Sequence, residues 1–187
     1  MKSHLVSQPN NSAGKESISE LRNAIEAKYW ANAPIGKLLQ EYSQGIDKVL
    51  TEIWYKHFQT NSNSALYAVG GYGRAELHPY SDIDLLLVSE NLDQEKSSIE
   101  QFFQEVFDLN LEVGHSARDI ASCTEQASKD ITVATAINEK RLIVGNQNLS
   151  SKIEDSSIKG KVWPSKLFFL AKLEEQKSRH KQFEDSE

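Results

Sequence analysis

The segment from Gly70 to Val88, GGYGRAELHPYSDIDLLLV, is the feature that most constrains the fold of this chain. A glycine pair follows an apolar stretch, and two aspartates, Asp82 and Asp84, stand at the head of a second apolar run. Because side chains on a strand alternate between its faces, both aspartates should point to the same side. At an effective dielectric near 20 and a separation of about 4 Å, two such charges repel by roughly 4 kcal/mol. A proton or a cation is therefore expected between them.

The residue types around this pair favour a divalent cation and a phosphate-bearing ligand. Mg²⁺ prefers oxygen donors and is commonly held by one or two carboxylates together with substrate phosphates. Gly70 and Gly71 would let the backbone approach a phosphate group and turn N–H groups toward it. Arg74 can pair with phosphate or with Glu76, and Ser81 can donate to phosphate or cap the loop. The segment predicts a metal-dependent site for a nucleoside triphosphate.

Length and composition agree with one globular domain and argue against several other classes of protein. Of the 187 residues, 39% are hydrophobic and 26% are charged. No apolar run approaches the ~20 residues of a membrane span, and residues 1–17 lack the apolar core of a signal peptide. The single cysteine, Cys123, excludes an internal disulfide, and the net charge of −6 argues against nonspecific nucleic-acid binding, which needs a basic face. We expect a cytoplasmic protein without membrane or nucleic-acid partners.

Hydrophobic spacing predicts helices interspersed with three strands. The strand that begins at Asp82 is apolar on both faces beyond Asp84, so it should be central in the sheet. Arg141 is expected to form an ion pair on a helix face, and His115 is expected to be structural. The expected strands cover 65–69, 82–89 and 111–116, and the expected helices cover 18–29, 34–58, 99–107, 119–127, 133–144 and 163–183.

Glu112 is the candidate for a third carboxylate of the site. Apolar residues flank it on the expected strand 111–116, and it would reach Asp82 and Asp84 if that strand lay beside theirs. Three carboxylates can hold two metal ions ~3.5–4 Å apart. One ion would activate an attacking oxygen and the other would neutralise charge on the triphosphate. An ion pair with Arg118 is the alternative role for Glu112.

A glycine pair, a D-h-D pattern and a later h-E-h pattern resemble the nucleotidyltransferase superfamily with the polymerase-β-like fold. The segment 70–88 resembles GGYGRxELxPxSDIDLL of the protein-PII uridylyltransferase family, the bifunctional uridylyltransferase/uridylyl-removing enzymes of bacterial nitrogen regulation. The resemblance covers roughly residues 18–187, with Asn110 and Ala117 standing where glycine and valine are usual. Further similar segments are LEVGHSAR at 111–118, DITVAT at 130–135 and AKLEEQKSRH at 171–180.

The resemblance implies an α+β fold of the polymerase-β-like nucleotidyltransferase type, a small mixed sheet with flanking helices, which we expect against one face. It also implies transfer of UMP from UTP to a tyrosine of a PII nitrogen-regulatory protein, with release of pyrophosphate and with Mg²⁺ as cofactor. The implied site residues are the catalytic metal ligands Asp82, Asp84 and Glu112 and the nucleotide-binding residues Gly70, Gly71, Arg74 and Ser81.

The expected organisation is a disordered arm at 1–17, a nucleotidyltransferase domain at 18–150 and the start of a helical region at 151–187. Members of the family continue into an HD-type phosphohydrolase domain and two glutamine-sensing ACT domains. We therefore expect the present residues to lack uridylyl removal and control by glutamine. Two alternatives stay open: transfer of AMP or another nucleotidyl group to a different acceptor, and binding of nucleotide or PII without turnover.

Overall fold

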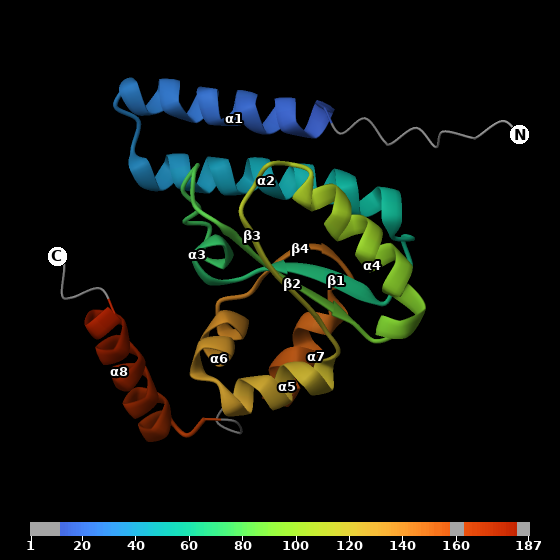
Figure 1. Cartoon of the computed structure of the whole chain (residues 1–187), viewed down its shortest axis with the longest axis vertical. Coiled ribbons are helices and arrows are strands. Elements are labelled where there is room, and N and C mark those ends of the chain that lie inside the picture. Colours follow the sequence, from blue (N-terminus) through green and yellow to red (C-terminus); the bar gives the residue numbers. More distant parts are fainter. Residues whose placement is uncertain (1–11, 158–162, 183–187) are drawn as a thin grey trace, which may run out of the picture.

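A four-stranded sheet lies between two groups of helices in the computed structural model, which describes residues 12–157 and 163–182 (Figure 1). The elements, in chain order, are α1 (Ser12–Trp30), α2 (Ile35–His57), β1 (Ser64–Ala68), α3 (Gly70–Gly73), β2 (Ile83–Ser89), α4 (Leu92–Phe107), β3 (Val113–Arg118), α5 (Ile120–Lys129), α6 (Ile131–Asn138), β4 (Arg141–Gly145), α7 (Asn148–Ser157) and α8 (Ser165–Gln182).

The sheet is mixed, with strand order β3-β2-β1-β4. β1 runs antiparallel to both β2 and β4, whereas β3 runs parallel to β2. β2 therefore has a neighbour on each side, which confirms the expected central strand. In the parallel register Asp84 lies opposite Gly114, so the aspartate segment and the LEVGHSAR segment are adjacent. This pairing meets the condition on which the candidate role of Glu112 depends, because the strand that follows Glu112 lies beside the strand that follows Asp82.

One face of the sheet is covered by α2 and α4, and α1 packs on the outer side of α2 (Figure 1). The apolar residues of α2 recur at helical spacing and are buried, so the sequence pattern predicts this helix correctly. An aromatic cluster joins α2 to α4, with the rings of Trp54 and Phe58 stacked at 3.7 Å and Phe102 edge-on to both. The core residues contributed by α2 are Leu38, Tyr42, Ile46, Leu50, Ile53 and Trp54.

The opposite face is covered by α5, α6 and α7, so the expectation of helices against one face is wrong. The physical reason is visible in β2, where Leu85 and Leu87 enter the first core and Leu86 and Val88 enter the second. A strand whose side chains are apolar on both faces of the sheet requires helices packed on both faces. Cys123 belongs to this second core and is fully buried, which raises the pKa of its thiol to about 11.

Several sequence-based boundaries differ from the structure, and one helix and one strand were not expected. The helix expected over 133–144 ends at Asn138, and Arg141–Gly145 instead form β4, because the β-branched run there pairs with β1. Residues 12–17 of the expected disordered arm already belong to α1, whose Ile18 and Ile25 are buried against the core; residues 1–11 lie outside the described part of the chain. The helix α7 was not expected. The final helix is confirmed as far as Gln182, and residue 183 is not described.

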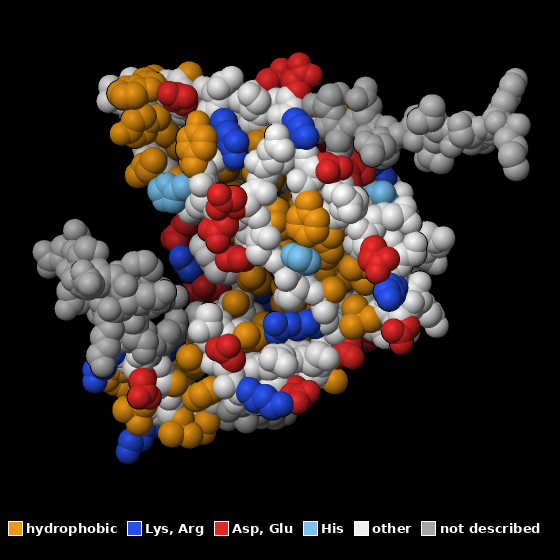
Figure 2. All heavy atoms as spheres, in the orientation of Figure 1, with side chains coloured by type: hydrophobic (Ala, Val, Ile, Leu, Met, Phe, Trp, Pro, Cys, Tyr) orange, Lys and Arg blue, Asp and Glu red, His pale blue; other side chains and the backbone are white. Residues whose placement is uncertain are grey.

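Several large apolar side chains remain at the surface, over α8 and around the turn between α1 and α2 (Figure 2). On α8 these are Leu167, Phe169, Leu170 and Leu173. None of the described helices is both long enough and apolar enough to cross a membrane.

Candidate active site

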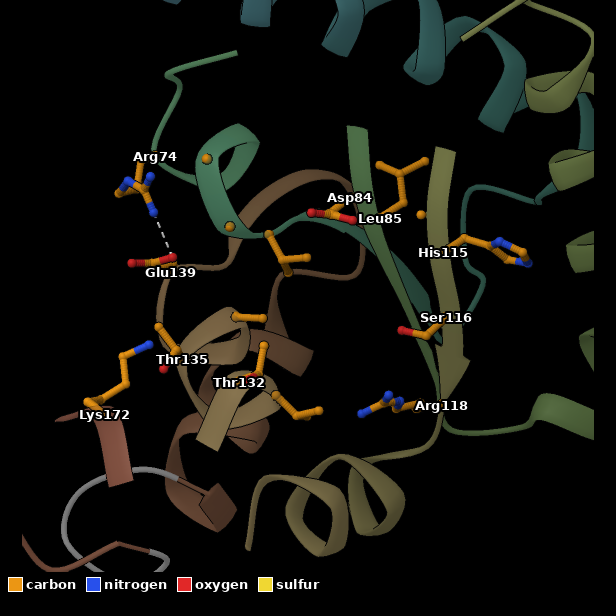
Figure 3. A pocket seen from close by; sticks show the side chains of 16 residues that line it. Arg74, Asp84, Leu85, His115, Ser116, Arg118, Thr132, Thr135, Glu139 and Lys172 are labelled. Carbon is orange, nitrogen blue, oxygen red and sulfur yellow. Dashed lines mark hydrogen bonds and ion pairs between the residues drawn. The ribbon is translucent and has the colours of Figure 1, made fainter. Parts of the chain in front are cut away.

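A cavity of about 590 Å³ opens where the ends of β1 and β2 meet α3, on the sheet face that α6 covers (Figure 3). Its size falls within the ~300–1,000 Å³ that is typical of small-molecule sites. Strand β3 supplies one wall, α6 another, and α8 reaches its edge through Lys172. The charged and hydroxyl-bearing residues of the lining, apart from His115, are Arg74, Asp84, Ser116, Arg118, Thr132, Thr135, Glu139 and Lys172.

Asp84 lies at the top of this cavity between two glycines. Its register partner Gly114 has no side chain, and a Cβ there would lie under 3.0 Å from an oxygen of the Asp84 carboxylate. Gly70, with φ of 59°, lies on the other side: a Cβ added to it would be 3.5 Å from the second carboxylate oxygen of Asp84. Partial burial, and then the charge of Asp82, raise the pKa of Asp84 above its ordinary value. A cation would relieve both effects, so the carboxylates fit the oxygen-rich site that Mg²⁺ prefers.

Asp82 and Glu112 lie next to each other in the parallel register, one residue before β2 and β3 begin. The Ile83 N–H donates to the carbonyl of Glu112 at 2.8 Å, which fixes this alignment. Both residues are exposed, and neither is among the residues that line the cavity. Within residues 12–157 and 163–182, no three His, Cys, Asp or Glu side chains are grouped so as to hold a metal ion. The three-carboxylate site stays a prediction.

Arg118 lies at the far end of β3 and points into the cavity (Figure 3). It is six positions from Glu112 on an extended segment, about 20 Å at roughly 3.3 Å per residue. The alternative of an ion pair between Glu112 and Arg118 is therefore not formed. Among the described residues, the side chain of Arg118 makes no hydrogen bond or ion pair, which leaves a half-buried guanidinium directed at the space that a ligand would fill.

The glycine-rich segment places its nucleotide-binding candidates differently from one another. Gly70 and Gly71 line the cavity directly. Arg74 also lines it, but its guanidinium pairs with Glu76 at 2.7 Å and with Glu139 at 2.8 Å. The hydrogen bond that Arg74 donates to the Glu76 carboxylate, above all, raises the pKa of Arg74. Ser81 donates to the carbonyl of His78 at 3.1 Å and caps the loop, outside the lining of the cavity.

Sequence reasoning assigned no binding role to several of the cavity residues. All of them lie in segments that resemble the family, so the resemblance points to those segments. No spacing rule, however, distinguishes these residues from their neighbours in the segments. His115 keeps its expected structural role, since its ring points away from the cavity and lies 4.6 Å from Phe103 and 5.0 Å from Phe107 (Figure 3). The residues that the sequence analysis missed are Ser116, Arg118, Thr132, Thr135 and Lys172.

Comparison with known proteins supports the resemblance. Bifunctional uridylyltransferase/uridylyl-removing enzymes are 39% identical in Ectopseudomonas mendocina (strain ymp), 40% in Pseudomonas fluorescens (strain Pf-5) and 38% in Pseudomonas aeruginosa (strain PAO1), each over 178 residues. Each match covers 94% of this chain and 20% of the relative, so the chain spans about a fifth of these proteins.

Two further comparisons concern the domain itself. A solved toxin–antitoxin structure with AMP-PNP shares 14% identity at a TM-score of 0.41, covering 74% of this chain and 96% of the other, a likeness too distant to support an argument. The nucleotidyltransferase domain family matches residues 50–179, which include the glycine pair, the aspartates and the whole sheet. The chain therefore belongs to the nucleotidyltransferase domain family.

Proposed function

We propose that this domain transfers UMP from UTP to a tyrosine of a PII nitrogen-regulatory protein and releases pyrophosphate, with Mg²⁺ as cofactor. The observation that carries the proposal is Asp84, which sits between Gly70 and Gly114 at the head of a cavity large enough for a nucleotide. The names of the relatives support uridylyl transfer in particular. The PII acceptor follows from the family resemblance alone.

In this proposal Asp82, Asp84 and Glu112 would hold Mg²⁺, which when bound supplies neutralisation of the phosphate charge. Gly70 and Gly71 would present backbone N–H groups to the triphosphate, because both line the cavity beside Asp84. Ser81 would join them only by exchanging its bond to the carbonyl of His78 for one to phosphate. These roles rest on the placement of α3 and β2 at one edge of the cavity.

Cationic side chains in the cavity support an anionic ligand. The chain carries a net charge of −6, yet Arg74, Arg118 and Lys172 all line this one space. Guanidinium groups bind phosphate through charge-assisted hydrogen bonds. Arg118 is the best candidate for such a contact, since Arg74 is already engaged by Glu76 and Glu139. A nucleoside triphosphate supplies both the charge and the length to reach from Asp84 toward Arg118.

The transfer step balances without any redox partner. The phenolic oxygen of the acceptor tyrosine forms a bond to the α-phosphorus, and the bond from that phosphorus to the bridging oxygen on the β side breaks. The electron pair leaves with pyrophosphate, and the phenolic proton passes to a carboxylate of the site, which we assign to Glu112. Positioning and charge neutralisation supply most of the rate in such reactions.

The net charge and composition further favour a cytoplasmic setting without a nucleic-acid partner.

The test is a transfer assay with labelled UTP, MgCl₂ and a PII protein, with labelled ATP in parallel. We expect label on PII from UTP only, and we expect Asp84→Asn to abolish it. Asp93→Asn is the matched control, because Asp93 is an exposed aspartate on α4, outside the cavity. Label from ATP alone would favour the adenylyl alternative. Binding of UTP without any transfer would show a domain that binds nucleotide without turnover.

A further inference from the structure

We propose that Arg141 is a positioning residue for nucleotide binding, which ties the glycine segment, residues 70–74, to helix α2 and to β4. The inference rests on the proposed function, since it assigns that segment to the triphosphate. Arg141 was expected on a helix face. It is instead the first residue of β4, and its side chain contacts the glycine segment. Arg141 does not line the cavity and would act only through the backbone that it holds.

The contacts of Arg141 form a closed set with two other elements. Its guanidinium donates to both carboxylate oxygens of Asp47 on α2, at 2.6 and 3.1 Å. It also donates to the backbone carbonyl of Tyr72 at 3.2 Å, inside the glycine segment. The Tyr72 hydroxyl donates back to Asp47 at 2.7 Å, and burial above all keeps the pKa of this hydroxyl well above its usual value. Three elements distant in sequence therefore meet in one hydrogen-bonded ring.

The residues just before Arg141 hold the same segment from a second side. Arg74, which follows the last residue of α3, pairs with Glu139 at 2.8 Å. Gly73 packs so closely on the chain that a Cβ there would lie under 3.0 Å from the carbonyl oxygen of Glu139. Residues 139–141 thus contact 72–74 through a backbone carbonyl, an ion pair and a close backbone packing.

The partly buried position of Arg141 lowers the stability of the fold, which points to a role other than stabilisation. Of the buried side-chain nitrogen and oxygen atoms in residues 12–157 and 163–182, the Nε of Arg141 alone has no hydrogen-bond partner. A buried donor without a partner is destabilising, and a partly buried ion pair adds little stability compared with apolar packing. Only arginine, however, can hold a carboxylate through two nitrogens and still donate to a carbonyl. The arrangement favours a fixed backbone position over maximal stability.

The position that Arg141 fixes is the edge of the cavity. Gly70 and Gly71 line that cavity, and the Tyr72 carbonyl held by Arg141 is the next residue along. A segment held this way presents its N–H groups without first having to be ordered by the ligand, and such pre-organisation improves binding. Loosening it should weaken UTP binding in the ground state and leave the binding of the protein acceptor unchanged.

The experiment compares Arg141→Gln and Arg141→Lys with the wild-type protein in steady-state uridylylation and in amide hydrogen exchange. We expect Arg141→Gln to raise the KM for UTP about tenfold or more while the KM for PII stays constant, because misplaced groups weaken binding. Arg141→Lys should fall between, since one ammonium cannot serve Asp47 and the Tyr72 carbonyl together. In Arg141→Gln the amides of Gly73 and Arg74 should exchange faster, while those of β2 should not.

The matched control is Glu105→Gln, which removes another partly buried ion pair of α2. Glu105 pairs with Lys56 and with His57, at 2.8 Å to the His57 ring, and none of these residues lines the cavity. A merely structural role for Arg141 would make both variants lower the melting temperature and the kcat at unchanged KM, and that result would overturn the proposal. Unchanged exchange at Gly73 and Arg74 would also overturn it.

Failure of the proposed function gives a different result. If the wild-type protein transferred no UMP, the uridylyl-transfer proposal would fail, and the dissociation constant of Mg²⁺–UTP would replace KM in the same comparison. Weaker UTP binding together with faster exchange of the Gly73 and Arg74 amides in Arg141→Gln would then still support the positioning role. Equal dissociation constants in wild type and variant would refute it.

Discussion

Gly114→Ala should inactivate the domain without unfolding it, because Gly114 is the register partner of Asp84. The new methyl group would lie under 3.0 Å from the Asp84 carboxylate, whereas the nearest atom outside Asp84 and the two residues adjacent to Gly114, the carbonyl oxygen of Ile83, is 3.9 Å away. The side chain of Asp84 is therefore the group that has to move. To reach ordinary van der Waals separation it must retreat by on the order of 1 Å, a displacement that can lower a rate about 100-fold.

Gly114→Ala should change the rate of transfer much more than the stability of the fold. A 100-fold loss of rate corresponds to about 2.7 kcal/mol of transition-state stabilisation. Stability should change far less, since alanine in place of a strand glycine gains roughly 0.5–1 kcal/mol and a displaced rotamer of Asp84 costs a similar amount. The expected result is a nearly unchanged melting temperature with a rate lowered about two orders of magnitude.

The assay is uridylylation of PII by wild type and Gly114→Ala, with thermal unfolding measured on the same samples. Gly36→Ala is the matched control, because Gly36 is exposed on α2 and, apart from its neighbours in the same helix turn, no atom lies within 4 Å of its Cβ position. Near-normal transfer by Gly114→Ala would refute the placement of Asp84 at the reacting centre. A large fall in melting temperature would refute the argument that only the carboxylate has to move.

The remaining predictions concern charge and metal. Without metal, ionisation of Asp84 should destabilise the fold, because its pKa is raised in the folded state and the unfolded chain therefore releases this proton more readily. In thermal unfolding with chelator, the stability advantage of Asp84→Asn over wild type should grow as pH rises through the acid range. Added Mg²⁺ should raise the melting temperature of wild type but not of Asp84→Asn, since ligands that bind only the native state stabilise it; an equal rise in both would count against the carboxylate site. Arg118→Ala should weaken UTP binding about tenfold or more at an unchanged melting temperature, because a charge-assisted hydrogen bond contributes about 1.5–3 kcal/mol. The control is Lys96→Ala, since Lys96 is an exposed lysine of α4 outside the cavity. Equal UTP affinity of wild type and Arg118→Ala in calorimetry would contradict the prediction.

The parts of the fold that the sequence predicts are those with strong local patterns. The helix α2 follows from its helical spacing, and the central position of β2 follows from apolar residues on both of its faces. The second helical layer did not follow, although the same residues of β2 require it, because deciding which helices cover which face depends on contacts far apart in sequence. The strand β4 was missed because no glycine or proline stands between α6 and Val144 to mark the end of the helix, and only pairing with β1 identifies the strand.

The candidate site divides along the same line. The closeness of Asp82 to Asp84 could be predicted because they stand two positions apart where β2 begins, although only Asp84 lines the cavity and the metal-binding role of both stays a prediction. Their neighbours Gly114 and Glu112 needed one further assumption, that β3 pairs with β2, which the crossover through α4 makes natural for a parallel strand.

Arg141 lies beyond such reasoning, since its carboxylate partner Asp47 is 94 positions away in the chain and its backbone partner Tyr72 is 69. No periodicity in a sequence reports a contact of that range. The aspartate pair at the start of β2 is therefore readable from a local pattern, whereas the cavity cations Arg118 and Lys172 and the residues that hold the glycine segment in place emerge only from the assembled structure. A substitution at either kind of residue should reduce transfer, but by different measurable routes: loss of the Asp84 carboxylate should lower kcat, and loss of the Arg141 guanidinium should raise the KM for UTP.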